Sequence, residues 1–135
     1  MVARAEGDGA FVAIELKHSM RRRKPRQPQQ HHHHVYVVLL DPAVLNERKV
    51  QAANPDRDPS KPCVYVGMTG LPPIERFENH KVGRKGSYYV CKYGLRLLPE
   101  LYEYLNPMPF DAACQMEKEL AEELRQQGYT VCGGT

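Results

Sequence analysis

Two side chains that could bind an anion and move a proton stand four positions apart at the end of CVYVGMTGLPPIERFENH, residues 63–80. On a helix, Arg76 and His80 would project from the same face toward a common point. A guanidinium matches phosphate oxygens with two parallel hydrogen bonds, and an imidazole exchanges a proton near neutral pH. The pair therefore suits an anionic group, although a surface helix that pairs these side chains with Glu75 or Glu78 explains the spacing better when the pair is taken alone.

A carboxylate falls on the apolar stripe of the last predicted helix, which runs from Asp111 to Gln127. The stripe recurs at three- and four-residue steps, at Ala113, Met116, Leu120, Ala121 and Leu124. Glu117 lies within it, and a carboxylate facing a core is costly without a cation, a proton or a cleft. Two explanations stand: a salt bridge to an arginine such as Arg76, or ligation of a hard divalent cation.

Two tyrosines occupy similar places in two predicted strands. The β-branched runs VYVVLL, residues 35–40, and CVYVGM, residues 63–68, favour neighbouring antiparallel strands. Pairing would bring Tyr36 and Tyr65 to one face of a sheet. Tyrosine in a strand is usually core packing, so these phenols become site candidates only beside the arginine, histidine and glutamate above.

Other elements must position these residues. The interval 41–62 is long for a hairpin loop, so it should hold a short helical turn or protrude. Glycine and prolines at TGLPP predict a short helix that ends near Gly83. We expect a second short helix at residues 97–105, and a final strand at YTVC, residues 129–132.

The composition is that of one globular domain with a tail. The chain has 135 residues, of which 41% are apolar, and a net charge of +3, with no apolar run approaching the roughly 20 residues of a membrane span. Residues 1–34 include RRRKPR and four consecutive histidines, which predicts a flexible tail before a domain at 35–135. Residues 11–18, FVAIELKH, could add an edge strand.

The start of the chain lacks the pattern of a secretory signal, so a cytoplasmic location is expected. The cysteines contain no C-x-x-C pair, and we expect buried, reduced thiols at Cys63, Cys91, Cys114 and Cys132.

Taken in order, these residues resemble the motifs of the GIY-YIG nuclease family over roughly residues 35–132. The first motif reads Val35-Tyr36-Val37 and the second Tyr65-Val66-Gly67, followed by Arg76, His80 and Glu117. The chain departs from the family at Val35, which replaces a glycine, at Met68, in the long gap between the motifs, and in lacking an asparagine near its end.

The resemblance implies an α+β fold, a small three-stranded antiparallel sheet flanked by helices, and an endonuclease that hydrolyses phosphodiester bonds with one Mg²⁺ or Mn²⁺. Glu117 would hold the metal, and Tyr36 would be the general base. Arg76 would bind phosphate, His80 would relay a proton or orient Tyr36, and Tyr65 would position water or phosphate. Arg76, His80 and the metal could supply the positive charge that favours a phenolate.

The expected partner is nucleic acid, with DNA ahead of RNA. Its contacts would come from the basic stretch at residues 80–96, through Lys81, Arg84, Lys85 and Lys92. Two other functions remain open: a nucleic-acid-binding module of the same fold that cuts little or nothing, and a structural domain in which Arg76 and Glu117 form a buried ion pair.

Overall fold

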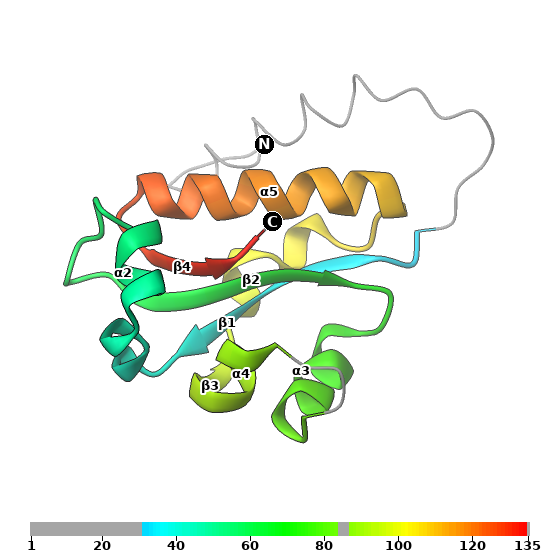
Figure 1. Cartoon of the computed structure of the whole chain (residues 1–135). Helices are drawn as coiled ribbons and strands as arrows, with labels where there is room; N and C mark the ends of the chain where they lie inside the picture. Colours follow the sequence, from blue (N-terminus) through cyan, green and yellow to red (C-terminus); the bar gives the residue numbers. More distant parts are fainter. Residues whose placement is uncertain (1–30, 84–86, 135) are drawn as a thin grey trace.

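A mixed four-stranded sheet forms the centre of the molecule (Figure 1). The computed structural model describes residues 31–83 and 87–134. The strands are β1 (His34–Leu40), β2 (Cys63–Thr69), β3 (Gly94–Leu97) and β4 (Thr130–Gly133), in the order β3-β1-β2-β4. The strand β1 is antiparallel to β2 and β3, and β4 is parallel to β2.

The α+β class and the adjacent pair β1 and β2 are confirmed, but the prediction of three antiparallel strands is wrong. The strand β3 is a fourth member of only four residues, GLRL, too short to show an alternating pattern. The predicted strand at residues 129–132 exists as β4. It runs parallel to β2 because the helix α5 (Phe110–Gln126) carries the chain back across the sheet.

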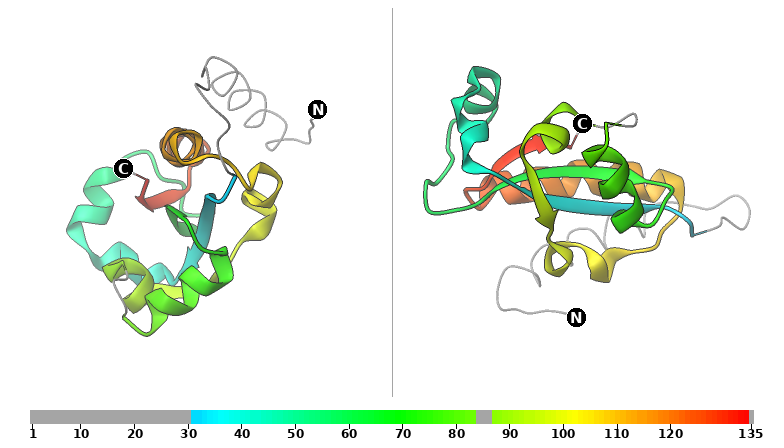
Figure 2. Two further views of the ribbon diagram at one scale, coloured as in Figure 1. Left: turned by 90° about the vertical axis from the view of Figure 1, so that its right-hand side faces the viewer. Right: turned by 90° about the horizontal axis from the view of Figure 1, so that it is seen from below.

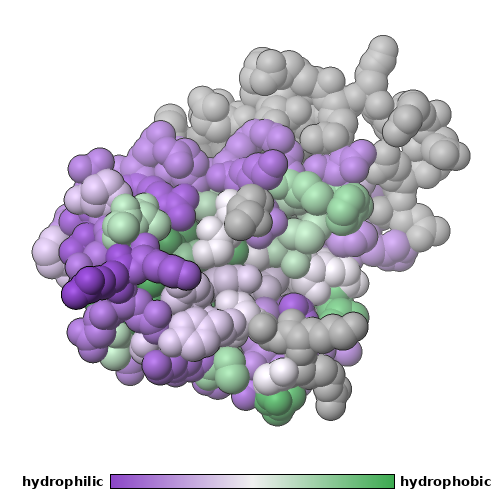
Figure 3. Space-filling view, viewed as in Figure 1, coloured by the Kyte–Doolittle hydropathy of each residue, from purple (hydrophilic) through white to green (hydrophobic). Residues whose placement is uncertain are grey.

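Helices cover both faces of the sheet (Figures 1 and 2). The helix α5 packs against β2, β4 and β1, whereas α3 (Pro73–Lys81) and α4 (Tyr88–Tyr93) pack on the other side. With both faces covered, β1 is apolar almost throughout, and Val35, Val37 and Val38 are fully buried. In space-filling view, hydrophilic residues gather at the α2 end of the molecule and over α5 (Figure 3).

The helices that carry site candidates lie close to their predicted bounds. The helix α3 is followed by Gly83, whose φ of 80° suits the turn past a helix end. The helix α5 begins one residue early, at Phe110 after Pro109, so Asp111 lies in the first turn instead of capping it. The predicted stripe of α5 is confirmed, since its five members are all buried.

The interval 41–62 contains the short helices η1 (Pro42–Asn46) and α2 (Arg48–Ala53). The second short helix expected at residues 97–105 is two 3-10 turns, η2 (Pro99–Leu101) and η3 (Glu103–Leu105). After α2, the buried Asn54 side chain bonds to Val131 of β4. Its Nδ2 donates to the carbonyl oxygen at 3.0 Å, and its Oδ1 accepts from the amide at 2.9 Å.

Most of the predicted tail, including residues 11–18 and 21–26, lies outside the described residues. Of its last residues, His33 bridges to Met108 and His34 begins β1. The described part of the chain has no helix long and apolar enough to cross a membrane.

All four cysteines are free thiols. Cys63 and Cys132 are buried, Cys114 is half-buried, and Cys91 is exposed. The expectation of burial is therefore wrong for Cys91, because α4 presents this residue to solvent.

Candidate active site

Three aromatic side chains meet on the sheet face that α3 covers. In the β1 and β2 register, Tyr36 lies opposite Gly67 and Val38 lies opposite Tyr65, so the two tyrosines are diagonal neighbours on one face. Their ring centroids are 6.2 Å apart, and the His80 ring lies 6.0 Å from Tyr36 and 5.9 Å from Tyr65. Tyr36 and His80 are each 1% exposed. The structure thus brings these three predicted site residues together.

Gly67 makes room for both phenols. A Cβ atom at this position would lie 2.7 Å from Oη and 2.8 Å from Cζ of Tyr36, and 3.0 Å from Cε2 of Tyr65. Real Cβ atoms do not approach other atoms this closely, so any side chain at position 67 would displace the rings. The glycine of the second motif therefore has a local physical reason, which the sequence alone did not supply.

Both ring nitrogens of His80 have a hydrogen-bond partner. The amide N–H of Ser87 donates to Nδ1 at 2.7 Å, and Nε2 lies 2.8 Å from the Oη atom of Tyr36. Burial, followed by the charge of Arg76, lowers the pKa of His80 to about 4, so the ring is neutral near pH 7. Because Nδ1 accepts a hydrogen bond, the one ring proton sits on Nε2 and is donated to Tyr36. Ser87 was not among the predicted site residues.

The neutral His80 corrects one expectation. It was counted among the positive charges that would favour a Tyr36 phenolate, but it supplies only an N–H donor at neutral pH. Burial, and then the proximity of Tyr65, raise the pKa of Tyr36, whereas the charge of Arg76 and a hydrogen bond from it act to lower this pKa. In the free protein Tyr36 is therefore a neutral phenol.

Arg76 and Glu117 both act electrostatically on the two phenols. Burial raises the pKa of Tyr65, the charge of Glu117 raises it further and the charge of Arg76 lowers it, and the two charges act in the same directions on the pKa of Tyr36. Beyond Val66 the strand β2 has no β4 partner, because β4 pairs only with Cys63 to Val66. Because β4 ends there, the Glu117 carboxylate on α5 can act electrostatically on Tyr36 and Tyr65 across the part of the sheet that β4 does not cover.

Glu117 is half-buried, and burial raises the pKa of its carboxyl, with Lys118 opposing. Within residues 31–83 and 87–134 it makes no hydrogen bond or ion pair, which disfavours the salt bridge to Arg76. The described residues also contain no group of three or more histidine, cysteine, aspartate or glutamate side chains that could hold a metal. A divalent ion here would therefore have one protein carboxylate and take its other ligands from water and substrate, which suits Mg²⁺.

Of the four basic residues predicted to contact nucleic acid, the structure describes two. The Lys81 ammonium group donates to the carbonyl of Gly94 at 3.0 Å, and the Lys92 ammonium group lies 5.6 Å from the Tyr88 ring centroid. Both side chains are exposed, and both have partners within the fold. Arg84 and Lys85 lie outside the described residues.

The fold and site define an α+β protein with a mixed four-stranded sheet and a buried tyrosine–histidine pair beside an arginine and a carboxylate. Comparison of the chain with models of protein families, with curated proteins and with solved structures returned no match.

Proposed function

We propose that this protein is a metal-dependent endonuclease of the GIY-YIG type that hydrolyses phosphodiester bonds in nucleic acid, with DNA as the first substrate to test. The observation that carries the proposal is the half-buried carboxylate of Glu117 beside two phenols, one of which is hydrogen-bonded to His80. A purely structural domain would be expected to neutralise such a carboxylate with a cationic side chain. A catalytic site would keep it for a divalent ion.

The resident ion would be Mg²⁺ or Mn²⁺ on Glu117, where it would polarise the scissile phosphate. Tyr36 is the general base in this scheme and takes a proton from the attacking water. Its own phenolic proton would first have to pass to solvent water, and burial raises the pKa that governs this step. The N–H of His80 Nε2 and the charge of Arg76 stabilise the phenolate that forms. Arg76 also binds the phosphate as negative charge accumulates on it.

The arrangement at His80 favours orientation of Tyr36 over relay of its proton. A relay would require Nε2 to accept the proton, but Nε2 already carries one while Ser87 occupies Nδ1. Hydrogen bonds with Ser87 and Tyr36 act to lower the pKa of Tyr65 against the larger effect of burial. In this scheme the Tyr65 hydroxyl positions water or a phosphate oxygen.

The test is cleavage of labelled single-stranded, duplex and branched DNA and of RNA with Mg²⁺ or Mn²⁺. Glu117→Gln and Tyr36→Phe should each lower the single-turnover rate by about 10²-fold to 10⁴-fold, since each removes a group that acts in the transition state. The matched controls are Glu122→Gln, on the exposed side of the same helix, and Tyr104→Phe, an exposed tyrosine. Both controls should cut as the wild type does.

The second candidate function is a nucleic-acid-binding module with little or no cleavage. The raised pKa of Tyr36 favours it, because a neutral phenol is a poor base. Salt-sensitive binding without metal-dependent cutting on any of these substrates would establish this second function. Cutting that survives in either site variant would overturn the assigned roles.

A further inference from the structure

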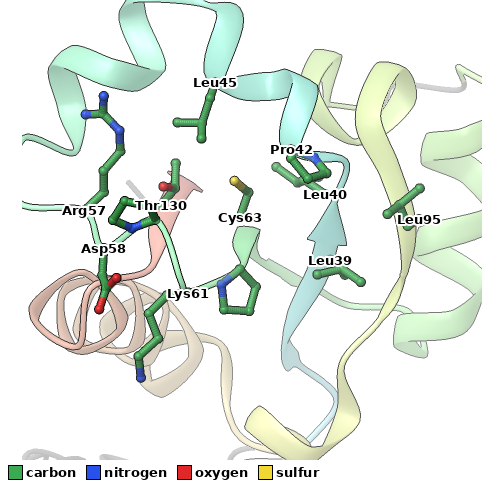
Figure 4. Close-up of a pocket in the computed structure, with 12 residues that line it drawn as sticks. Leu39, Leu40, Pro42, Leu45, Arg57, Asp58, Lys61, Cys63, Leu95 and Thr130 are labelled. Carbon is green, nitrogen blue, oxygen red and sulfur yellow. The ribbon is translucent and has the colours of Figure 1, made fainter.

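A pocket lies at the end of the sheet opposite the tyrosines (Figure 4). Its volume is about 480 Å³, within the size range of small-molecule sites. It is bounded by the ends of β1 and β2, by the turn at residues 57–62 and by Leu95 of β3. The pair Leu40 and Cys63 marks this end of the β1 and β2 ladder, whereas Tyr36 and Gly67 lie toward the other end.

The walls of this pocket are mainly apolar. They consist mostly of leucine and proline side chains, among them Leu39, Leu45 and Leu95. Two polar groups also line it, the Cys63 thiol and the Thr130 hydroxyl. A hydrogen bond with Thr130 acts to lower the pKa of the Cys63 thiol against the larger effect of burial, and both residues are at least 95% buried. The thiol and hydroxyl inside the pocket therefore need no hydrogen bond from a ligand. The apolar part of a ligand would enter at little desolvation cost.

Charged side chains stand on one side of the rim only, where Figure 4 shows Arg57, Asp58 and Lys61. The Asp58 carboxylate already accepts hydrogen bonds from the amide and hydroxyl of Ser60, at 2.9 and 2.8 Å. The Lys61 ammonium group lies over the Tyr129 ring, 5.4 Å from its centroid. The rim thus has two cations, and its one anion is already bonded within a turn.

Hydrogen bonds from one nitrogen hold the Arg57 guanidinium in place, and its other N–H groups are left for a ligand. Its Nη1 donates to the carbonyls of Asn54 at 2.9 Å and Gln51 at 3.3 Å, at the end of α2. Among the described residues its Nε and Nη2 have no acceptor. A guanidinium held by one nitrogen keeps the others in a fixed fork, which matches a carboxylate or sulfonate, and in Figure 4 this fork lies at the outer edge of the rim beside α2.

We propose that this pocket binds an amphipathic monoanion, a small molecule with a hydrocarbon or aromatic body inside the pocket and a carboxylate at Arg57. The apolar walls select the body and the one-sided cationic rim selects the charge. The site is separate from the proposed nuclease site and does not depend on that function.

The probe is 8-anilinonaphthalene-1-sulfonate, an aromatic body with one anionic group, whose fluorescence rises on entering an apolar site. Decanoate should displace it from the full chain at lower concentration than decanol, which has the same tail without the charge. Arg57→Met should weaken decanoate binding about tenfold and leave decanol unchanged. Arg96→Met, at an exposed arginine on β3 that does not line the pocket, is the matched control and should change neither.

Leu45→Trp should fill the pocket and remove both ligands, with urea unfolding as the check that the variant folds. Equal displacement by decanoate and decanol, or probe binding unaffected by Leu45→Trp, would overturn the proposal.

A readout on the wild-type chain keeps the test independent of the variants. Cys63 lines the pocket, whereas Cys91 is exposed on α4. Decanoate should slow alkylation of Cys63 by iodoacetamide and leave that of Cys91 unchanged, as followed by peptide mass spectrometry. Equal alkylation of Cys63 with and without decanoate would also overturn the proposal.

Discussion

Tyr36 and His80 share a buried hydrogen bond whose direction is set by a backbone amide outside their own elements. The Ser87 N–H occupies Nδ1, so the imidazole donates to the phenol. Substitution of the Ser87 side chain would leave that amide in place, whereas a change in the path of the chain before α4 would remove it. The tyrosine–histidine pair therefore depends on where the backbone of Ser87 lies more than on the residue type at position 87.

The neutral state of His80 gives a prediction for stability. Its pKa is about 4 in the folded protein, against 6.5 for an unperturbed imidazole. Between these values the unfolded chain binds a proton that the folded protein does not. The free energy of unfolding should therefore fall as pH is lowered from 6.5 toward 4, by on the order of 2 kcal/mol from this group.

Urea unfolding at pH 7.0, 6.0 and 5.0 measures this effect, and His80→Gln should flatten the dependence. The control His34→Gln should leave most of the dependence in place, because it keeps His80, although burial also lowers the pKa of His34. An unchanged slope in His80→Gln would show that other groups account for the acid sensitivity.

At this scale the sequence predicted the chemically distinctive side chains and missed what only the fold supplies. Arg76, His80 and Glu117 stood out because guanidinium, imidazole and a carboxylate on an apolar stripe are informative by type and spacing. The Ser87 amide could not stand out, since every residue except proline carries one. The loss of charge on His80 likewise follows from its burial, which no local pattern in the sequence reveals.

Among the elements, the β1 and β2 pair does most to build the site, and Gly67 is its tightest point. Gly67→Ala should displace the Tyr36 ring, because the new Cβ would lie 2.7 Å from its hydroxyl oxygen. We expect a loss of about 1–3 kcal/mol in stability, as for other overpacked cores, and a larger proportional loss of cleavage.

The measurements are urea unfolding and single-turnover cleavage. Gly70→Ala is the control, since a Cβ there meets the His33 ring only at 3.4 Å. Cleavage at the wild-type rate in Gly67→Ala would mean that Tyr36 can work from another position.

The sequence predicted the elements with strong local patterns and failed where pairing is long-range. The β-branched runs of β1 and β2 and the stripe of α5 were recognisable within one window each. The strand β3 has four residues, two of them exposed, and is a strand only because it pairs with β1. The parallel direction of β4 depends on how the intervening chain crosses the sheet, and nothing within YTVC encodes that.

At the scale of the whole molecule, the basic segment at residues 21–26 is expected to add affinity for nucleic acid without selecting sequence. Replacing its four arginines and one lysine with glutamine should reduce the slope of log K against log salt by up to about 4. Binding to duplexes of different sequence should weaken to the same degree. Fluorescence anisotropy over a range of salt concentrations measures the slope, and an unchanged slope would place the phosphate contacts elsewhere.

Asn54 has a consequence for the molecule in concentrated solution. The strand β4 is one of the two outer strands of the sheet, and at Val131 its amide and carbonyl are both bonded to the Asn54 side chain. An outer strand ordinarily offers such groups to the next molecule, and edge-to-edge growth of that kind leads to fibres. Here the carboxamide takes the place that a fifth strand would occupy. At Val131, therefore, one buried side chain bonds the two backbone groups through which another molecule would pair, which disfavours edge-to-edge growth at that position.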